Sequence, residues 1–291
     1  MPQSPTADPR PFHMGDGPVG CLLLHGFTGS PAEVRPLGEH LADHGVRVVA
    51  PLLPGHGTEP QDMDHCTWVD WVAAAETVWG ALEPQCSHLF VGGISMGALI
   101  AAVVAERHPQ AAGLLAFSPA LKASNRLLAL SPLLRHVVRQ IAAPSSSDLV
   151  DPEAAASLWH YETRSVAAAA QLYRLQRVVR RLLPRVMTPA IVFYARHDGA
   201  IARDSAWRYC QLLGSLPKTY AVYGRSGHNM LVDSERDMIM RQTWQWMQFC
   251  TSRGGRDVID TSQEEPLVDG HTAIGRGADR PGSGATQRNH R

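Results

Sequence analysis

Short apolar runs alternate with longer amphipathic stretches along most of this chain. Runs with the length of buried strands lie at residues 18–24, 46–50, 113–117 and 190–194. Helical patterns at 67–82 and 98–108 lie between such runs. Strands that alternate with helices predict a parallel sheet covered on both faces. We therefore expect an α/β fold with a mostly parallel central sheet flanked by helices.

The first helix of this pattern has a local start signal. Ser30-Pro31-Ala32-Glu33 has the sequence of a capping box, with proline at the first helical position. In such a box the glutamate carboxylate accepts the N–H of the capping residue. The pattern predicts a helix that begins here and ends near Gly45.

Three segments do not follow the alternation. Residues 121–187 separate two predicted strands and contain helical stretches at about 127–141 and 165–183. Residues 253–291 hold no aromatic residue and few large apolar ones, so burial cannot offset their chain entropy. The expected division is a flexible N-terminus at 1–14, an α/β core at 15–120 and 188–252, a helical cap insertion at 121–187 and a disordered tail at 253–291.

The pentapeptide Gly93-Ile94-Ser95-Met96-Gly97 lies between an apolar run and an alanine-rich helical stretch. A G-x-S-x-G pattern between a strand and a helix is typical of the nucleophile elbow of serine hydrolases. Its glycines permit a turn that raises the serine hydroxyl clear of the sheet. The alternative is a structural serine in a glycine-rich turn, which the presence of an acid and a base elsewhere argues against.

Candidates for that acid and base follow two later strand-like runs. Asp198 follows the apolar run at 190–194, and His228 follows the run at 220–223. The chain order Ser95, Asp198, His228 is the order of an α/β-hydrolase triad.

Other residues of the same types receive structural interpretations. Asp204 and Asp233 compete for the role of the acid, although each stands where it would cap a following helix. His25 and His56 lie in loop motifs and are interpreted as hydrogen bonders that shape those loops.

The residue types fit acyl transfer. An alcohol is a poor nucleophile near neutral pH, so an imidazole must accept its proton, and a carboxylate must orient that imidazole. The acyl oxygen gains negative charge, so fixed N–H donors must face it. In this fold one donor follows the nucleophile and one follows an early strand, which predicts an oxyanion hole formed by the backbone N–H groups of Phe27 and Met96. This chemistry requires no cofactor and no metal.

The motifs around these residues resemble the bacterial monoacylglycerol lipase and carboxylesterase group of the α/β-hydrolases. The matching segments fall within about residues 18–250 and are 23–30, 54–58, 62–63, 67–72, 93–97, 195–198 and 226–228. A dehalogenase or an epoxide hydrolase would carry aspartate at the nucleophile position, where this chain has Ser95.

The resemblance implies a serine esterase that acts through an acyl-serine intermediate, with monoacylglycerols as the expected substrates. A small-molecule carboxylesterase, a carbon–carbon bond hydrolase and a non-catalytic binding protein on the same fold remain alternatives. The resemblance also implies a substrate-binding role for Glu162, whose carboxylate would accept hydrogen bonds from two glycerol hydroxyls. The alternative is a surface glutamate paired with Arg164.

Charge and hydropathy exclude several other classes. The 27 basic and 27 acidic residues balance, so no overall field recruits nucleic acid. The chain has no apolar block of membrane-spanning length and no secretory signal pattern at its N-terminus, so we expect a cytoplasmic protein. Five widely spaced cysteines predict reduced thiols. The expected partner is a small-molecule ester or lipid substrate, and the oligomeric state stays open.

The insertion at 121–187 is basic, with ten basic residues against four acidic ones. It presents either a solvated helix face or a surface that makes transient contact with anionic lipid membranes. The insertion also has five leucines that either line an acyl tunnel or belong to an ordinary core. They are Leu127, Leu128, Leu130, Leu133 and Leu134.

Overall fold

The computed structural model describes residues 7–143, 147–158, 161 and 163–252, together with the backbone of 272–274. An 8-stranded sheet runs through it in the order β1-β3-β2-β4-β5-β8-β9-β10. The inner strands are parallel, and their bounds are β3 Val46–Ala50, β2 Val19–Leu24, β4 His88–Ile94, β5 Gly113–Phe117, β8 Ala190–Ala195 and β9 Lys218–Tyr223. The predicted α/β class with a mostly parallel sheet is confirmed.

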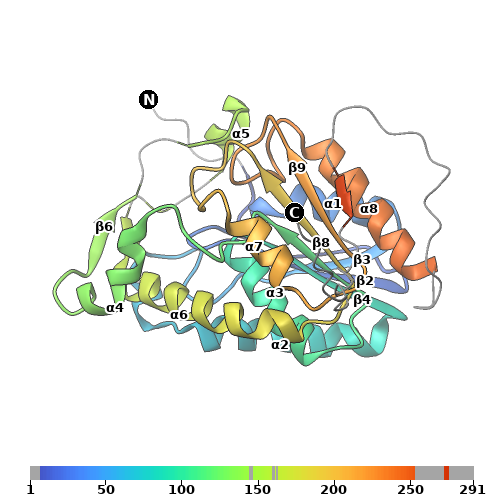
Figure 1. Cartoon of the computed structure of the whole chain (residues 1–291), viewed down its shortest axis with the longest axis horizontal. Helices are drawn as coiled ribbons and strands as arrows, with labels where there is room; N and C mark the ends of the chain where they lie inside the picture. Colours follow the sequence, from blue (N-terminus) through green and yellow to red (C-terminus); the bar gives the residue numbers. More distant parts are fainter. Residues whose placement is uncertain (1–6, 144–146, 159–160, 162, 253–271, 275–291) are drawn as a thin grey trace, which may run out of the picture.

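Helices cover both faces of this sheet (Figure 1). One face packs against α1 Arg35–Asp43 and α8 Arg236–Ser252, and the other against α2 Trp68–Leu82, α3 Met96–Arg107, α6 Val166–Leu182 and α7 Ser205–Leu212. Alternate residues of a strand serve opposite faces. In β2, Leu22 and Leu24 pack with α2 and α3, whereas Cys21 and Leu23 pack on the face of α1 and α8. Within the described ranges, no helix combines the length and the apolar character needed to cross a membrane.

Both edges of the sheet carry a short antiparallel strand. β1 Phe12–Met14 pairs with β3, and the backbone of β10 Thr272–Ile274 pairs with β9. The expected flexibility of 1–14 is therefore wrong for residues 12–14, because Phe12 is buried and the Arg35 guanidinium lies 4.6 Å from its ring centroid. Within the predicted tail at 253–291 the structure describes β10 alone, and the rest of that prediction lies outside the described residues.

The insertion between β5 and β8 contains both helices and strands. Its elements are η4 Arg126–Leu130, α4 Ser131–Leu134, α5 Pro152–Ser157, α6, η5 Leu183–Arg185 and an antiparallel ribbon of β6 Gln140–Ala142 with β7 Thr163–Ser165. The long helix predicted at 165–183 is confirmed as α6. The helix predicted at 127–141 is wrong beyond Leu134. The chain turns there, and the β-branched residue Ile141 enters the ribbon.

The start of α1 also differs from its prediction. Pro31–Glu33 forms a short 3-10 turn, η1, and Ser30 makes no side-chain capping bond. The Glu33 carboxylate turns inward and accepts the N–H of Gly26. The capping-box pattern was misleading because a buried N–H in the preceding loop takes this carboxylate.

Candidate active site

Ser95 lies at the sharp junction between β4 and α3, which this single residue separates. Its backbone has φ 57° and ψ −113°, a strained combination for a residue with a side chain. A Cβ at Gly93 would lie 2.4 Å from the carbonyl carbon of Gly97, and a Cβ at Gly97 would lie 2.1 Å from the carbonyl oxygen of Leu24. The turn therefore needs glycine at both positions of the motif.

Asp198 and His228 meet in the loops that follow β8 and β9. Nδ1 of His228 lies 2.8 Å from Oδ2 of Asp198. An ionised carboxylate accepts hydrogen bonds, so Nδ1 carries the hydrogen and Nε2 is left to accept a proton. Because β4, β5, β8 and β9 are parallel neighbours, these loops and the Ser95 turn lie at the same edge of the sheet.

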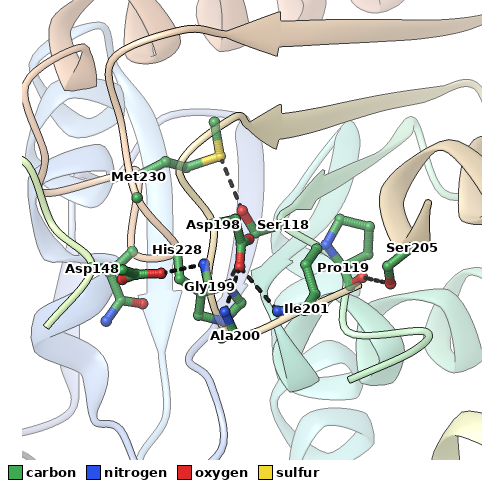
Figure 2. A network of polar contacts seen from close by, with 12 residues as sticks. Ser118, Pro119, Asp148, Asp198, Gly199, Ala200, Ile201, Ser205, His228 and Met230 are labelled. Atoms are coloured by element: carbon green, nitrogen blue, oxygen red, sulfur yellow. Dashed lines mark hydrogen bonds and ion pairs between the residues drawn. The ribbon is translucent and has the colours of Figure 1, made fainter. Parts of the chain in front are cut away.

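The Asp198 side chain is buried and both of its oxygens are engaged (Figure 2). Oδ1 accepts the N–H groups of Ala200 and Ile201, each at 3.0 Å. Burial alone raises the pKa of this carboxyl. The His228 imidazole, the Ile201 N–H and the Ser118 hydroxyl outweigh that effect and hold the pKa below its ordinary value. Asp198 is therefore ionised near neutral pH.

The His228 imidazole is surrounded by acidic groups. Burial lowers its pKa, but the carboxylate of Asp198 and the more remote charges of Asp148 and Glu33 outweigh this and raise the pKa above its ordinary value. Asp148 belongs to the insertion, and its Oδ2 accepts the N–H of Gly199 at 2.7 Å (Figure 2). The surroundings thus favour the imidazolium, which is the form that a histidine base reaches when it takes a proton.

The two competing carboxylates have other partners. Asp204 lies 2.6 Å from Nε of Arg208 and 3.4 Å from Nζ of Lys122. Asp233 is buried and accepts backbone N–H groups, those of Val150, Asp151, Gly227 and Ser234. It therefore ties the insertion to the loop that carries His228, and Asp198 is the carboxylate bonded to that ring.

The loop after β2 fixes the peptide that carries the Phe27 N–H. The carbonyl of Gly26 accepts Nδ1–H of His25 at 2.9 Å and the N–H of Gly29 at 3.2 Å. Burial holds the pKa of His25 well below its ordinary value, so the ring is neutral and its Nε2 accepts the Leu53 N–H at 3.0 Å. The C=O and N–H of a trans peptide point in opposite directions, so the Phe27 N–H points away from these donors.

The second expected donor is the N–H of Met96. This residue is the first of α3, where an N–H has no partner within its own helix. Neither this N–H nor that of Phe27 donates to another group within the part of the chain that the structure describes. The two loops are close, since a Cβ at Gly26 would lie 3.3 Å from Cβ of Ser95. An oxyanion hole requires such an arrangement of uncommitted donors beside the nucleophile.

Sequence reasoning missed one buried carboxylate beside this site. Glu33 is 8% exposed; its Oε2 accepts the Gly26 N–H at 2.7 Å, and its Oε1 accepts Nδ2–H of Asn229 at 3.3 Å. Burial raises the pKa of Glu33, and the Gly26 N–H, His228 and Asn229 offset part of the rise. The capping-box pattern was the one signal at this position, and it pointed to the wrong partner.

The insertion makes its own polar contacts with the core. The Tyr161 hydroxyl accepts the Thr58 N–H at 3.1 Å and donates to the Gly55 carbonyl at 3.2 Å. Glu162, the expected substrate-binding residue, lies outside the described residues.

Comparison with known proteins identifies the family. The family model described as serine aminopeptidase, S33, matches residues 19–235. The chain belongs to this family. A thermostable monoacylglycerol lipase of Bacillus sp. (strain H-257) is 33% identical over 234 residues, which cover 80% of this chain and 92% of that protein. A carboxylesterase of Bacillus subtilis (strain 168) is 25% identical, with 82% and 96% covered. The resemblance drawn from the motifs is confirmed.

Solved structures agree on the fold of this family member. One from work on the metagenome-derived lipolytic enzymes LipS and LipT has a TM-score of 0.79 at 28% identity, and covers 84% of this chain and 100% of its own. The monoacylglycerol lipase of Paleococcus ferrophilus has a TM-score of 0.71 at 18% identity, with 82% and 98% covered. The latter likeness shows the fold alone. The chain has the α/β-hydrolase fold.

Proposed function

We propose that this protein is a serine esterase that hydrolyses carboxylic esters through an acyl-Ser95 intermediate. One observation carries the proposal: a serine in a strained strand-to-helix turn lies at the same end of the parallel strands as His228, which is hydrogen-bonded to the buried carboxylate of Asp198. The relatives named as a lipase and a carboxylesterase support the same reaction class.

In the first half of the reaction, Nε2 of His228 takes the hydroxyl proton as Oγ of Ser95 attacks the ester carbonyl carbon. The N–H groups of Phe27 and Met96 stabilise the oxyanion that forms. Asp198 stays ionised and stabilises the imidazolium. The bond to the leaving alcohol then breaks, and the imidazolium returns the proton to the alcohol oxygen.

In the second half, His228 takes a proton from a water molecule that attacks the acyl carbon. The tetrahedral intermediate collapses, the carboxylic acid leaves, and the proton returns to Oγ of Ser95. Water is the second nucleophile, and Ser95, His228, Asp198 and the two backbone N–H groups supply the catalytic roles in both halves.

Monoacylglycerols are the proposed substrates. The support is the 33% identical relative, which is named a monoacylglycerol lipase. The family description names an aminopeptidase, so amide hydrolysis by the same residues is the alternative reaction.

A substrate panel tests this proposal. We expect kcat/KM to be highest for monoacylglycerols of short to medium chain length, lower for diacylglycerols, and negligible for aminoacyl p-nitroanilides, with Ser95→Ala as the zero control. Preference for p-nitrophenyl esters over every glyceride would indicate a general carboxylesterase. Preference for the anilides would overturn ester hydrolysis, and no turnover of any ester would favour a carbon–carbon hydrolase or a binding protein.

The outer part of the insertion supports a transient contact with lipid surfaces. Leu133 is 73% exposed and Val137 is 81% exposed, and both lie close in sequence to Arg135 and Arg139. Four of the five leucines expected in a tunnel or core are exposed, at positions 127, 130, 133 and 134. We expect sedimentation with vesicles that contain phosphatidylglycerol, weaker sedimentation with pure phosphatidylcholine, and loss at high salt. If the protein sediments with neither kind of vesicle, the interpretation as a solvated helix face is favoured.

A further inference from the structure

Glu33 lies between the two loops that the proposed reaction uses. Its Oε2 is bonded to the N–H of Gly26, which precedes the proposed donor Phe27. Its Oε1 is bonded to Nδ2 of Asn229, which follows the proposed base His228. One buried side chain therefore bridges the oxyanion loop at 25–29 and the histidine loop at 226–229.

The oxyanion loop is built around this carboxylate. A Cβ at Gly29 would lie 2.2 Å from Oε1 of Glu33, so the glycine leaves the space that the carboxylate fills. A Cβ at Gly26 would lie 3.1 Å from Oε2 of Glu33 and 3.3 Å from Cβ of Ser95. The carboxylate and the nucleophile thus flank the same glycine. Glu33 accepts both hydrogen bonds, one at each of its oxygens.

We propose that Glu33 is a positioning residue for ester hydrolysis, which holds the oxyanion loop and the histidine loop in one fixed relation beside Ser95. The role rests on the function proposed above. Glu33 anchors the N–H of Gly26, while His25 and Gly29 anchor its carbonyl. Two successive peptides are therefore fixed before substrate binds, and donors that are already oriented stabilise a developing oxyanion best.

Glu33 also contributes to the charge environment of His228. The carboxylates of Asp198, Asp148 and Glu33 each favour a higher pKa of His228, and His228 in turn favours a lower pKa of Glu33. A nearby anion favours the imidazolium. Neutralising Glu33 should therefore lower the pKa of His228 while Asp198 and Asp148 remain.

Four substitutions test the role, with p-nitrophenyl butyrate as substrate. Glu33→Ala removes both bonds and the charge, and we expect kcat to fall about 100-fold with KM changed less than about threefold. Glu33→Gln keeps an acceptor but no charge, so a fall of about tenfold is expected. Asn229→Ala frees only the histidine-loop end and should lower kcat severalfold. Glu39→Gln, at an exposed position of α1, is the matched charge control and should leave kcat unchanged.

Two readouts separate positioning from a contribution to stability alone. The affinity for butylboronic acid, which forms a tetrahedral adduct with the serine, should fall in Glu33→Ala in parallel with kcat/KM. The acid limb of the kcat/KM profile reports the proton that His228 must lose, so Glu33→Gln should move that limb to lower pH. Glu39→Gln should move neither.

The outcomes are distinct. Wild-type kcat, boronate affinity and pH profile in folded Glu33 variants would overturn the positioning role, as would losses that equal the fall in folded fraction by circular dichroism. If no Glu33 variant folds, unchanged kcat and boronate affinity in Asn229→Ala overturn it. A wild-type protein that hydrolyses no ester would instead overturn the proposed function.

Discussion

The candidate site at the carboxyl ends of the parallel strands and the insertion at 121–187 differ in how their side chains are partnered. At the sheet edge, Asp198 and Glu33 are buried and each of their oxygens has a partner. In the outer part of the insertion, the large apolar side chains between Leu127 and Ile141 are mostly exposed. The proposed catalytic groups thus belong to a frame of well-partnered polar side chains, whereas the outer part of the insertion presents exposed apolar side chains to its surroundings.

The insertion is nevertheless tied to the frame at a few polar points. The Tyr161 hydroxyl bonds to the loop at 55–58, Ser165 donates to the Asp64 carboxylate, and Asp148 accepts the Gly199 N–H. These ties connect backbone and side chains that are far apart in sequence. They fix where the insertion meets the site, and none of them involves the exposed apolar side chains between Leu127 and Ile141.

The largest effect should come from the frame itself. Ser95→Ala removes the nucleophile, and we expect kcat to fall roughly a million-fold with little change in melting temperature, because alanine keeps the Cβ of the turn. Steady-state kinetics and calorimetry measure the two quantities. An organophosphate should label Ser95 of the wild-type protein, as detected by mass spectrometry. A label on another serine would refute this assignment.

Asp198→Asn tests the second element of the frame. The amide cannot hold the imidazole in the required tautomer, so we expect kcat to fall roughly 10⁴-fold with the fold retained. Asp204→Asn is the matched control, since Asp204 pairs with Arg208 and Lys122 at the surface, and its kcat should stay near that of the wild type. A large loss in the control and a small loss in Asp198→Asn would reverse the assignment of the acid.

The positions of Ser95, Asp198 and His228 could be predicted from the sequence because local patterns determine the turn and the strands that carry them. Gly93 and Gly97 are set by the clash that any Cβ would meet, and the buried parallel strands appear as apolar runs. Asp198 and His228 follow two such runs, so their meeting at one sheet edge could be predicted from chain order.

What the sequence did not reveal depends on contacts between distant segments. Glu33 and Asn229 are 196 residues apart, and no local pattern links them. The Asp148 carboxylate accepts the N–H of Gly199, which is 51 residues away in the sequence. No periodic pattern in the sequence indicates how the insertion packs against the core. Phe12 and its strand were missed because proline-rich surroundings concealed a three-residue edge strand.

Glu162→Ala examines the insertion and should have an intermediate, selective effect. If this carboxylate binds the glycerol hydroxyls, the variant loses about 1.5 to 3 kcal/mol of binding free energy for the glycerol group. The kcat/KM for monoacylglycerols should then fall roughly 10- to 150-fold. p-Nitrophenyl esters carry no glycerol, so their kcat/KM should stay unchanged. Equal losses on both substrates would mean that the insertion supports the frame itself, and no loss would leave Glu162 as a surface glutamate paired with Arg164.

The smallest effect is expected from the C-terminal segment, which belongs to neither region. β10 adds three backbone pairs at the edge of β9, and β9 keeps its six-residue pairing with β8. Deletion of 275–291 should leave the melting temperature unchanged. Deletion of 256–291 also removes β10, and an edge pairing worth on the order of 1 kcal/mol would lower the melting temperature by about 2 to 4 °C. Neither deletion should change kcat/KM. A large fall in the melting temperature on deletion of 275–291, measured by calorimetry, would show that residues beyond β10 dock on the core. A fall in kcat/KM would mean that the C-terminal segment also supports the site of Ser95, Asp198 and His228. The site would then depend on more than the sheet and the loops that carry it.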